Sequence, residues 1–341
     1  MKTKNLKTVG TTNTLKGIAI LAVLINHYLN LNISGNSTGF ANAWIAIFFF
    51  LSGYGLFHSL KHQNLYTTKD LLLFYYQRII RIFPLLWIAW IIELMVRRGN
   101  ISFWIPTGIH ASGHYWFIPA LLQCYLLSPA IYLSIKNRSI ISFLSFLSML
   151  ILVNLLGRQA PLIIKIASFF HICWRGIYFL HILVFFFGML TPSIISPLKE
   201  RKYDVTYIFI FWFYIFLIIS LMIFLKIYSH ANFIMVFAFN VAPLFFIILL
   251  CCYSIRYSIK IQFLEYLGSI SYSIYLFHMS YYLLVSNLGA FSNNSTKELI
   301  AYIIIFPLFI LICDYIERFG RSLNKKLKSL VIINGAQQIK D

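Results

Sequence analysis

Lys16 and His27 are the residues whose types and placement point most directly to chemistry. Both lie in the apolar run 15–28, and His27 follows Lys16 by eleven residues. Eleven residues are about 20° more than three full α-helical turns, so both side chains lie on one helix stripe, about 16 Å apart. Because ionisable groups in hydrocarbon are costly, the pair is a candidate functional site. A snorkelling lysine and a structurally hydrogen-bonded histidine would give the same pattern.

Arg78 and Arg81 form a second candidate pair. They stand three residues apart at the start of the apolar run 79–97, on one face of the expected helix. Two guanidinium groups there suit a polyanion such as a phosphate-rich cofactor, because the planar fork of arginine binds phosphate oxygens in pairs. Anchoring of the helix end at lipid headgroups is the competing explanation.

A metal site is not expected. His110 and His114 are four residues apart, a spacing that suits a metal ion only if their loop is helical. Pro106, Gly108 and Gly113 argue against a helix there. The sequence contains no zinc signature, nucleophile elbow or glycine-rich phosphate loop.

Three short features are predicted to be structural. Glu93 with Arg97, and Asp314 with Arg318, are acid–base pairs at helical spacing within apolar runs. Gly53 belongs to the block Phe48–Gly55 near the end of the run 40–59, and its small size permits close contact between helices.

The elements that hold these residues are predicted to be membrane-spanning helices. The chain has 341 residues, of which 60% are hydrophobic and 11% charged, and its mean hydropathy is +0.80. A usual soluble domain has about 25% charged residues. Many apolar runs approach the roughly 20 residues with which a helix crosses a bilayer, and none alternates like the strands of a closed barrel. We predict an all-α polytopic membrane protein, a bundle of about ten transmembrane helices in one membrane-embedded domain over residues 1–341.

The loops between the predicted spans carry a biased charge. The spans run over 15–31, 40–59, 79–97, 116–135, 139–156, 177–193, 205–226, 233–253, 266–289 and 299–317. With the N-terminus in the cytoplasm, 21 of the 28 Lys and Arg residues lie on the cytoplasmic side and 7 on the other. Because Lys and Arg are enriched in cytoplasmic loops, this split predicts that both termini are cytoplasmic.

The net charge of +19 does not indicate nucleic acid as a partner, because the basic residues sit in short links and form no stripe interleaved with aromatic residues. The 33 Phe and 22 Tyr are expected to face membrane lipid and neighbouring helices. Three lysines before the first run resemble a signal peptide, but no small-residue cleavage site follows. We therefore predict a retained first helix.

Taken in order, these motifs resemble acyltransferase family 3, a family of integral-membrane acyltransferases. Its first-helix motif, a basic residue followed by ten residues and a histidine, matches Lys16 to His27, although the family usually has arginine at the first position. Further blocks match Phe49 to Gly53; Arg78, Arg81, Ile82 and Pro84; Trp116, Phe117, Tyr125 and Pro129; Leu267, Gly268, Ser271, Tyr272, Tyr275, Leu276 and His278; and Ile316 to Arg318. Each block alone is weak, but their order covers nearly the whole chain.

The resemblance implies transfer of an acyl group, most often acetyl, from cytoplasmic acyl-CoA to a hydroxyl of a carbohydrate. The chain is similar to members without an extra soluble domain, which modify O-antigen or related lipid-linked glycans. It is therefore expected to be a multi-pass protein of the bacterial inner (cytoplasmic) membrane, with acyl-CoA as donor, a surface or lipid-linked carbohydrate as acceptor, and no metal.

The resemblance also implies roles for the candidate residues. His27 is the catalytic residue, and Lys16, Arg78 and Arg81 bind the phosphates of acyl-CoA. His27 acts as general base on the acceptor hydroxyl or carries the acyl group as a nucleophile, and the sequence leaves both open. The main alternative function is a transporter or flippase for a lipid-linked sugar, although the chain shows no internal repeat. A structural membrane subunit without chemistry is a third alternative.

Overall fold

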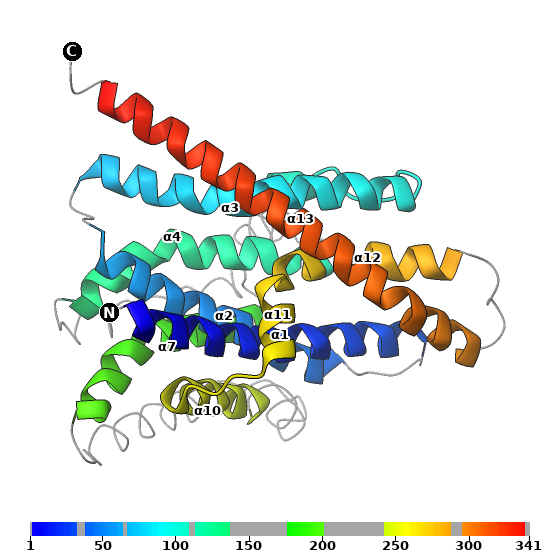
Figure 1. Cartoon of the computed structure of the whole chain (residues 1–341), viewed down its shortest axis with the longest axis horizontal. Helices are drawn as coiled ribbons and strands as arrows, with labels where there is room; N and C mark the ends of the chain where they lie inside the picture. Colours follow the sequence, from blue (N-terminus) through cyan, green and yellow to red (C-terminus); the bar gives the residue numbers. More distant parts are fainter. Residues whose placement is uncertain are drawn as a thin grey trace, which may run out of the picture. The chain divides into compact units, whose positions relative to one another are not determined.

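The computed structural model describes residues 2–32, 38–63, 67–108, 113–136, 176–200, 242–287 and 295–337. Within these ranges every regular element is a helix (Figure 1). The elements are α1 (Lys2–Asn32), α2 (Thr38–Lys61), α3 (Thr68–Val96), the 3₁₀ helices η1 (Ile105–Thr107) and η2 (Gly113–Trp116), α4 (Phe117–Lys136), α7 (Gly176–Glu200), α10 (Ala242–Tyr257), α11 (Gln262–Ser269), α12 (Ser271–Asn287) and α13 (Ser295–Gln337). The all-α prediction is confirmed for the described part of the chain.

Five described segments are long and apolar enough to cross a membrane: Val9–Leu29, Trp44–Lys61, Thr68–Val96, Gly113–Lys136 and Leu299–Ser329. A sixth is formed if α10 and α11, bent by 114° at a short break, count as one span. The five overlap the predicted spans that begin at residues 15, 40, 79, 116 and 299. Because the predicted spans 139–156 and 205–226 lie outside the described residues, the total of ten stays a prediction.

The helices form two compact units, which are described separately. The first holds α1, α2, the end of α4 from Ala130, α7, α10, and α11 up to Gly268. The second holds α3, η1, η2, α4 up to Pro129, α12 and α13. That the whole chain acts as one domain stays a prediction.

Glycines let the helices of the first unit touch along their backbones. A Cβ atom on Gly53 of α2 would collide with the carbonyl oxygen of Phe185 in α7, and one on Gly188 of α7 would collide with that of Phe50. Only residues without a side chain allow this approach, which is typical of helix pairs in membranes. The predicted close contact at Gly53 is therefore confirmed.

Glycines also allow close backbone contact between α11 and α1. A Cβ atom on Gly17 would collide with the backbone of Leu264, and one on Gly268 with the backbone carbonyl of Asn13. The backbone N–H of Ile261, just before α11, donates a hydrogen bond to Oγ1 of Thr14 at 3.2 Å. Residues just before and just after Lys16 thus contact α11 and the residue that precedes it, and these contacts hold this turn of α1 in place.

We expect Gly17→Ala to destabilise the protein by about 1 to 3 kcal/mol, the usual cost of forcing extra atoms into a packed contact. The obstacle is backbone, which cannot swing aside as a side chain would. Gly55→Ala is the matched control, because no atom lies within 4 Å of the added Cβ atom. Thermal unfolding of the detergent-solubilised proteins measures the difference, and equal midpoints for the two variants would contradict the backbone contact.

In the second unit, α3 begins eleven residues before the predicted span because a capping residue precedes it. Oγ1 of Thr67 accepts a hydrogen bond from the backbone N–H of Asp70 at 3.1 Å and donates one to Oδ2 of the same residue at 2.6 Å. Such a cap satisfies backbone donors that the first helical turn leaves without a partner. Arg78 and Arg81 therefore lie well inside α3, in its third and fourth turns.

The end of α3 is folded back onto the helix. Arg98 and Gly99 have φ angles of 52° and 85°, which turn the chain after Val96. Nε1 of Trp90 then donates a hydrogen bond to the carbonyl of Ser102 at 3.1 Å. This places the following loop beside the last turns of α3.

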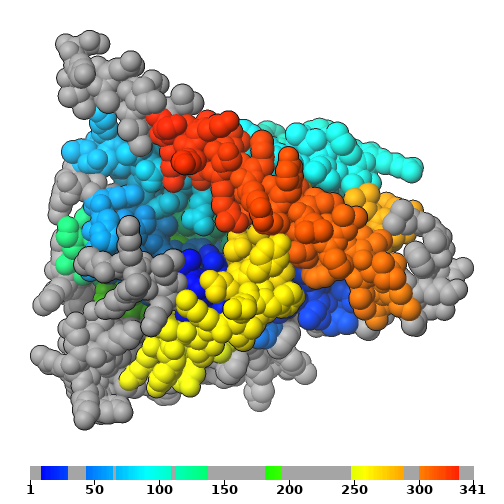
Figure 2. Space-filling model, in the orientation of Figure 1, coloured from blue at the N-terminus to red at the C-terminus, as the bar shows by residue number. Residues whose placement is uncertain are grey.

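The predicted span 266–289 is divided into α11 and α12. Nη2 of Arg321 in α13 donates a hydrogen bond to the carbonyl of Ser269 at 3.1 Å, so this terminal carbonyl is satisfied by a side chain. α12 is then tied to its neighbours, because Tyr272 OH donates to the carbonyl of Ile82 at 2.9 Å and Ser273 Oγ donates to Glu317 Oε2 at 2.6 Å. In Figure 2, α13 (orange to red) lies over this part of the unit.

Candidate active site

Lys16 and His27 lie on one unbroken helix, α1, so the spacing that placed them on one stripe holds. Both side chains are half-buried. Asn26, next to His27, is 5% exposed, so this turn brings a second polar side chain into the interior of the first unit. A cation and an imidazole thus share one side of α1, about 16 Å apart along its axis.

Arg78 and Arg81 lie on α3 in the second unit. Arg78 is 8% exposed, and its guanidinium carbon lies 4.8 Å from the centre of the Phe74 ring. Arg81 is exposed, and the two positive charges interact. The aromatic face holds one guanidinium in place while the other reaches the surface. Lys16 and His27 belong to the first unit and the two arginines to the second, so the two candidate pairs are described separately.

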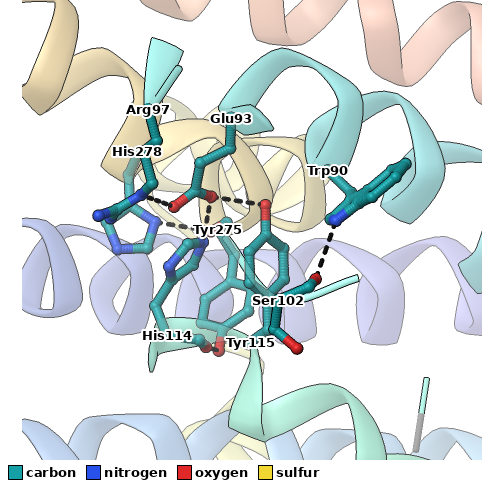
Figure 3. A network of polar contacts seen from close by, with 8 residues as sticks. All are labelled: Trp90, Glu93, Arg97, Ser102, His114, Tyr115, Tyr275 and His278. Carbon is teal, nitrogen blue, oxygen red and sulfur yellow. Dashed lines mark hydrogen bonds and ion pairs between the residues drawn. The ribbon is translucent and has the colours of Figure 1, made fainter. Parts of the chain in front are cut away.

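A cluster of ionisable side chains surrounds Glu93, near the end of α3 (Figure 3). Nε of Arg97 donates to Oε1 of Glu93 at 2.6 Å, and Tyr115 OH donates to Oε2 at 2.7 Å. Nε2 of His114 lies 3.5 Å from the same Oε2. Glu93 is only 2% exposed. A buried carboxylate requires such partners, and here they come from α3 and η2.

Two residues of α12 complete this Glu93 cluster. Tyr275 OH donates to the backbone carbonyl of His114, and the His114 and His278 rings lie 5.0 Å apart. Nδ1 of His278 lies 2.6 Å from the carbonyl of Tyr275. A carbonyl only accepts hydrogen bonds, so Nδ1 holds the proton, and in the neutral ring the lone pair is on Nε2. His278 is therefore oriented with its basic nitrogen fixed.

The Glu93 cluster can hold and exchange protons, because it joins a carboxylate, a phenol and two imidazoles. Its central members, Glu93, His114, Tyr115, Tyr275 and His278, are each at most 7% exposed. In this arrangement they link α3, η2 and α12. The cluster therefore holds these three helices together.

The structure confirms both predicted ion pairs. Glu93 pairs with Arg97, and Nη2 of Arg318 lies 2.7 Å from Oδ2 of Asp314. The other partners of Glu93 were not predicted from the sequence. The available signal was the carboxylate itself, because a lone acid within an apolar helix must be matched by donors from elsewhere in the chain.

In the described ranges, no group of three or more His, Cys, Asp and Glu side chains comes together to hold a metal ion. His110 lies outside the described residues, and His114 is paired with Glu93.

The apolar helices and their buried ionisable groups define an integral membrane protein. A family model described as "Acyltransferase domain", that of acyltransferase family 3, matches residues 12–318. The chain belongs to this family, and the protein is an acyltransferase. The matched range includes Lys16, His27, Arg78, Arg81 and the Glu93 cluster, and it confirms the resemblance drawn from the ordered motifs. No curated protein and no solved structure matches the chain.

Proposed function

We propose that this protein moves an acyl group, acetyl in the simplest case, from cytoplasmic acyl-CoA to a hydroxyl of a surface polysaccharide or a lipid-linked glycan such as O-antigen. The observation that carries the proposal is the family match over residues 12–318, which contains both candidate pairs in the predicted order. The described spans support an enzyme embedded in the bilayer. We place it in the bacterial inner membrane.

His27 is the proposed catalytic residue. As general base, its neutral imidazole takes the proton of the acceptor hydroxyl while the oxygen attacks the thioester carbonyl carbon. The C–S bond then breaks, and the departing CoA thiolate takes the proton back from the imidazolium. Atoms and charge balance without a metal or a redox partner.

The covalent alternative differs in one observable intermediate. If His27 attacks the thioester itself, the acyl group rests on the imidazole before the acceptor hydroxyl removes it. Labelled acetyl-CoA supplied without acceptor would then leave label on the wild-type protein and none on His27→Gln. General-base catalysis leaves no such label.

The donor is proposed to bind from the cytoplasm, the side on which the charge bias of the loops predicts Lys16, Arg78 and Arg81. In support, α13 continues past the predicted end of its span at residue 317 through a run of basic residues. These are Arg318, Arg321, Lys325, Lys326 and Lys328. A basic helix end of this kind is typical of the cytoplasmic side.

Surface glycan from cells with and without the chain tests the function. Mass spectrometry of the glycan should show an ester-linked acyl group that mild alkali removes, present only when the chain is expressed. A glycan whose export changes while its acyl content stays constant would favour the transporter and contradict the proposal.

Lys16 variants test the donor side. We expect Lys16→Arg to retain activity, because the charge is kept and the residue usual in the family is restored. Lys16→Ala should raise the apparent KM for acyl-CoA about tenfold, since a charge-assisted contact contributes about 1.5 to 3 kcal/mol, and should leave the KM for acceptor unchanged. Lys61→Ala, at an exposed lysine that ends α2, is the control. A higher KM for the acceptor with an unchanged KM for acyl-CoA would contradict the assignment of Lys16 to the donor site.

A further inference from the structure

A third cation lies beside Arg78 and Arg81, supplied by the far end of the sequence. α3 and α13 touch at two levels. Tyr76 OH donates a hydrogen bond to the carbonyl of Leu327 at 3.3 Å, and a Cβ atom on Gly320 would lie 2.9 Å from a methyl carbon of Leu85. From the first contact to the second, the residue number rises from 76 to 85 on α3 and falls from 327 to 320 on α13, so the two helices are antiparallel here. The red end of α13 lies against the start of α3 in Figure 2.

This packing brings Lys328 to the two arginines. Lys328 follows Leu327 directly, and its ammonium interacts electrostatically with both Arg78 and Arg81. Arg81 and Lys328 are exposed, whereas Arg78 is buried against Phe74. The three residues, here called the cation cluster, thus combine a fixed guanidinium with two groups that reach the surface.

Three like charges brought together by tertiary packing repel one another. An anion bound among them is attracted to all three, and this attraction offsets their repulsion. The chemistry favours phosphate. Arginine forks bind two phosphate oxygens at once, and a lysine ammonium acts as a point charge beside them. Arg321, on the same helix, has different partners: its Nη2 donates to the carbonyl of Ser269, and its Nε lies 3.7 Å from Oε1 of Glu317.

We propose that Lys328 completes, with Arg78 and Arg81, a phosphate-binding site built from α3 and α13, and that this site receives the phosphate-rich end of the acyl-CoA donor. The identity of the donor rests on the proposed function. The sequence separation of 251 residues between Tyr76 and Leu327 explains why no local motif marks this site.

The test measures binding of CoA to the full chain in nanodiscs of zwitterionic lipid by isothermal titration calorimetry. Lys328→Ala should weaken CoA binding about tenfold, the effect of losing one charge-assisted contact. Lys328→Arg should stay within about twofold of wild type. Lys326→Ala is the matched control, since this exposed lysine lies two residues away, about 200° around the same helix, and should bind as wild type does. Equal thermal midpoints establish that all variants are folded.

Anionic lipid headgroups offer the same chemistry, so a second arm repeats the titration with phosphatidylglycerol in the nanodiscs. A Lys328→Ala variant that binds CoA as wild type does, but binds less phosphatidylglycerol, would overturn the assignment to the donor. Unchanged affinity for both would overturn the site. If CoA binding depends on Lys328 while no acyl group is transferred, the site stands and the proposed function fails. If transfer persists with CoA binding unchanged in Lys328→Ala, this inference alone fails.

Discussion

We expect His27→Gln to abolish acylation of the surface glycan while the protein still reaches the membrane at its normal level. Glutamine keeps a polar side chain that donates and accepts hydrogen bonds, but it cannot take a proton near pH 7. General-base assistance contributes about 10² to 10⁴-fold in rate, so its loss should leave almost no acyl groups on the glycan. Mass spectrometry of the glycan, at matched protein abundance, measures the result.

Two further variants separate catalysis from packing at this position. His27→Ala should be as inactive as His27→Gln, although the smaller side chain of alanine removes more packing contacts around α1. His58→Gln, at an exposed histidine in the last turn of α2, should acylate as wild type does. Near-normal acylation by His27→Gln combined with loss in His27→Ala would show that the histidine is structural.

We expect Glu93→Ala to lower the free energy of unfolding by about 3 kcal/mol. This is the low end of the range for an ion pair broken by removing one partner, because the Arg97 side chain is 32% exposed and can turn to water. Tyr115 OH, by contrast, is left buried without its acceptor. Thermal unfolding in detergent should show a midpoint lower by about 5 °C or more.

Asp314→Ala is the control for this prediction. Its partner Arg318 is 73% exposed, and exposed ion pairs contribute about 0 to 1 kcal/mol, so the unfolding midpoint should barely change. Glu93→Gln keeps the shape of the side chain and an acceptor for Tyr115, and should lie between wild type and Glu93→Ala. Equal midpoints for Glu93→Ala and Asp314→Ala would contradict the structural role of the Glu93 cluster.

Features set by local sequence could be predicted. Apolar runs of spanning length gave the five described spans, because a helix satisfies its own backbone in lipid. The Glu93–Arg97 pair followed from helical spacing, and the contact at Gly53 from its missing side chain. The early start of α3 could also have been found, since Thr67 and Asp70 form a capping pattern.

Features set by tertiary packing could not be predicted from the sequence. Tyr115 reaches Glu93 across 22 residues, and Tyr275 reaches the His114 carbonyl across 161. No periodicity within one helix encodes such distances. At the break between α11 and α12, the Ser269 carbonyl accepts a hydrogen bond from Arg321, 52 residues further along the chain. In the sequence, Lys328 was only one of the basic residues counted for the orientation in the membrane. The roles of Lys16, His27, Arg78 and Arg81 stay predictions.

Transfer by the purified protein tests the central claim most directly. The full chain is reconstituted in liposomes with acetyl-CoA labelled in the acetyl group and a lipid-linked glycan, and both the glycan and the released CoA thiol are measured. The account predicts alkali-labile label on the glycan and one thiol released per acetyl group transferred, with neither from His27→Gln. Glycan that crosses the bilayer without gaining label, while acetyl-CoA stays intact, would contradict it.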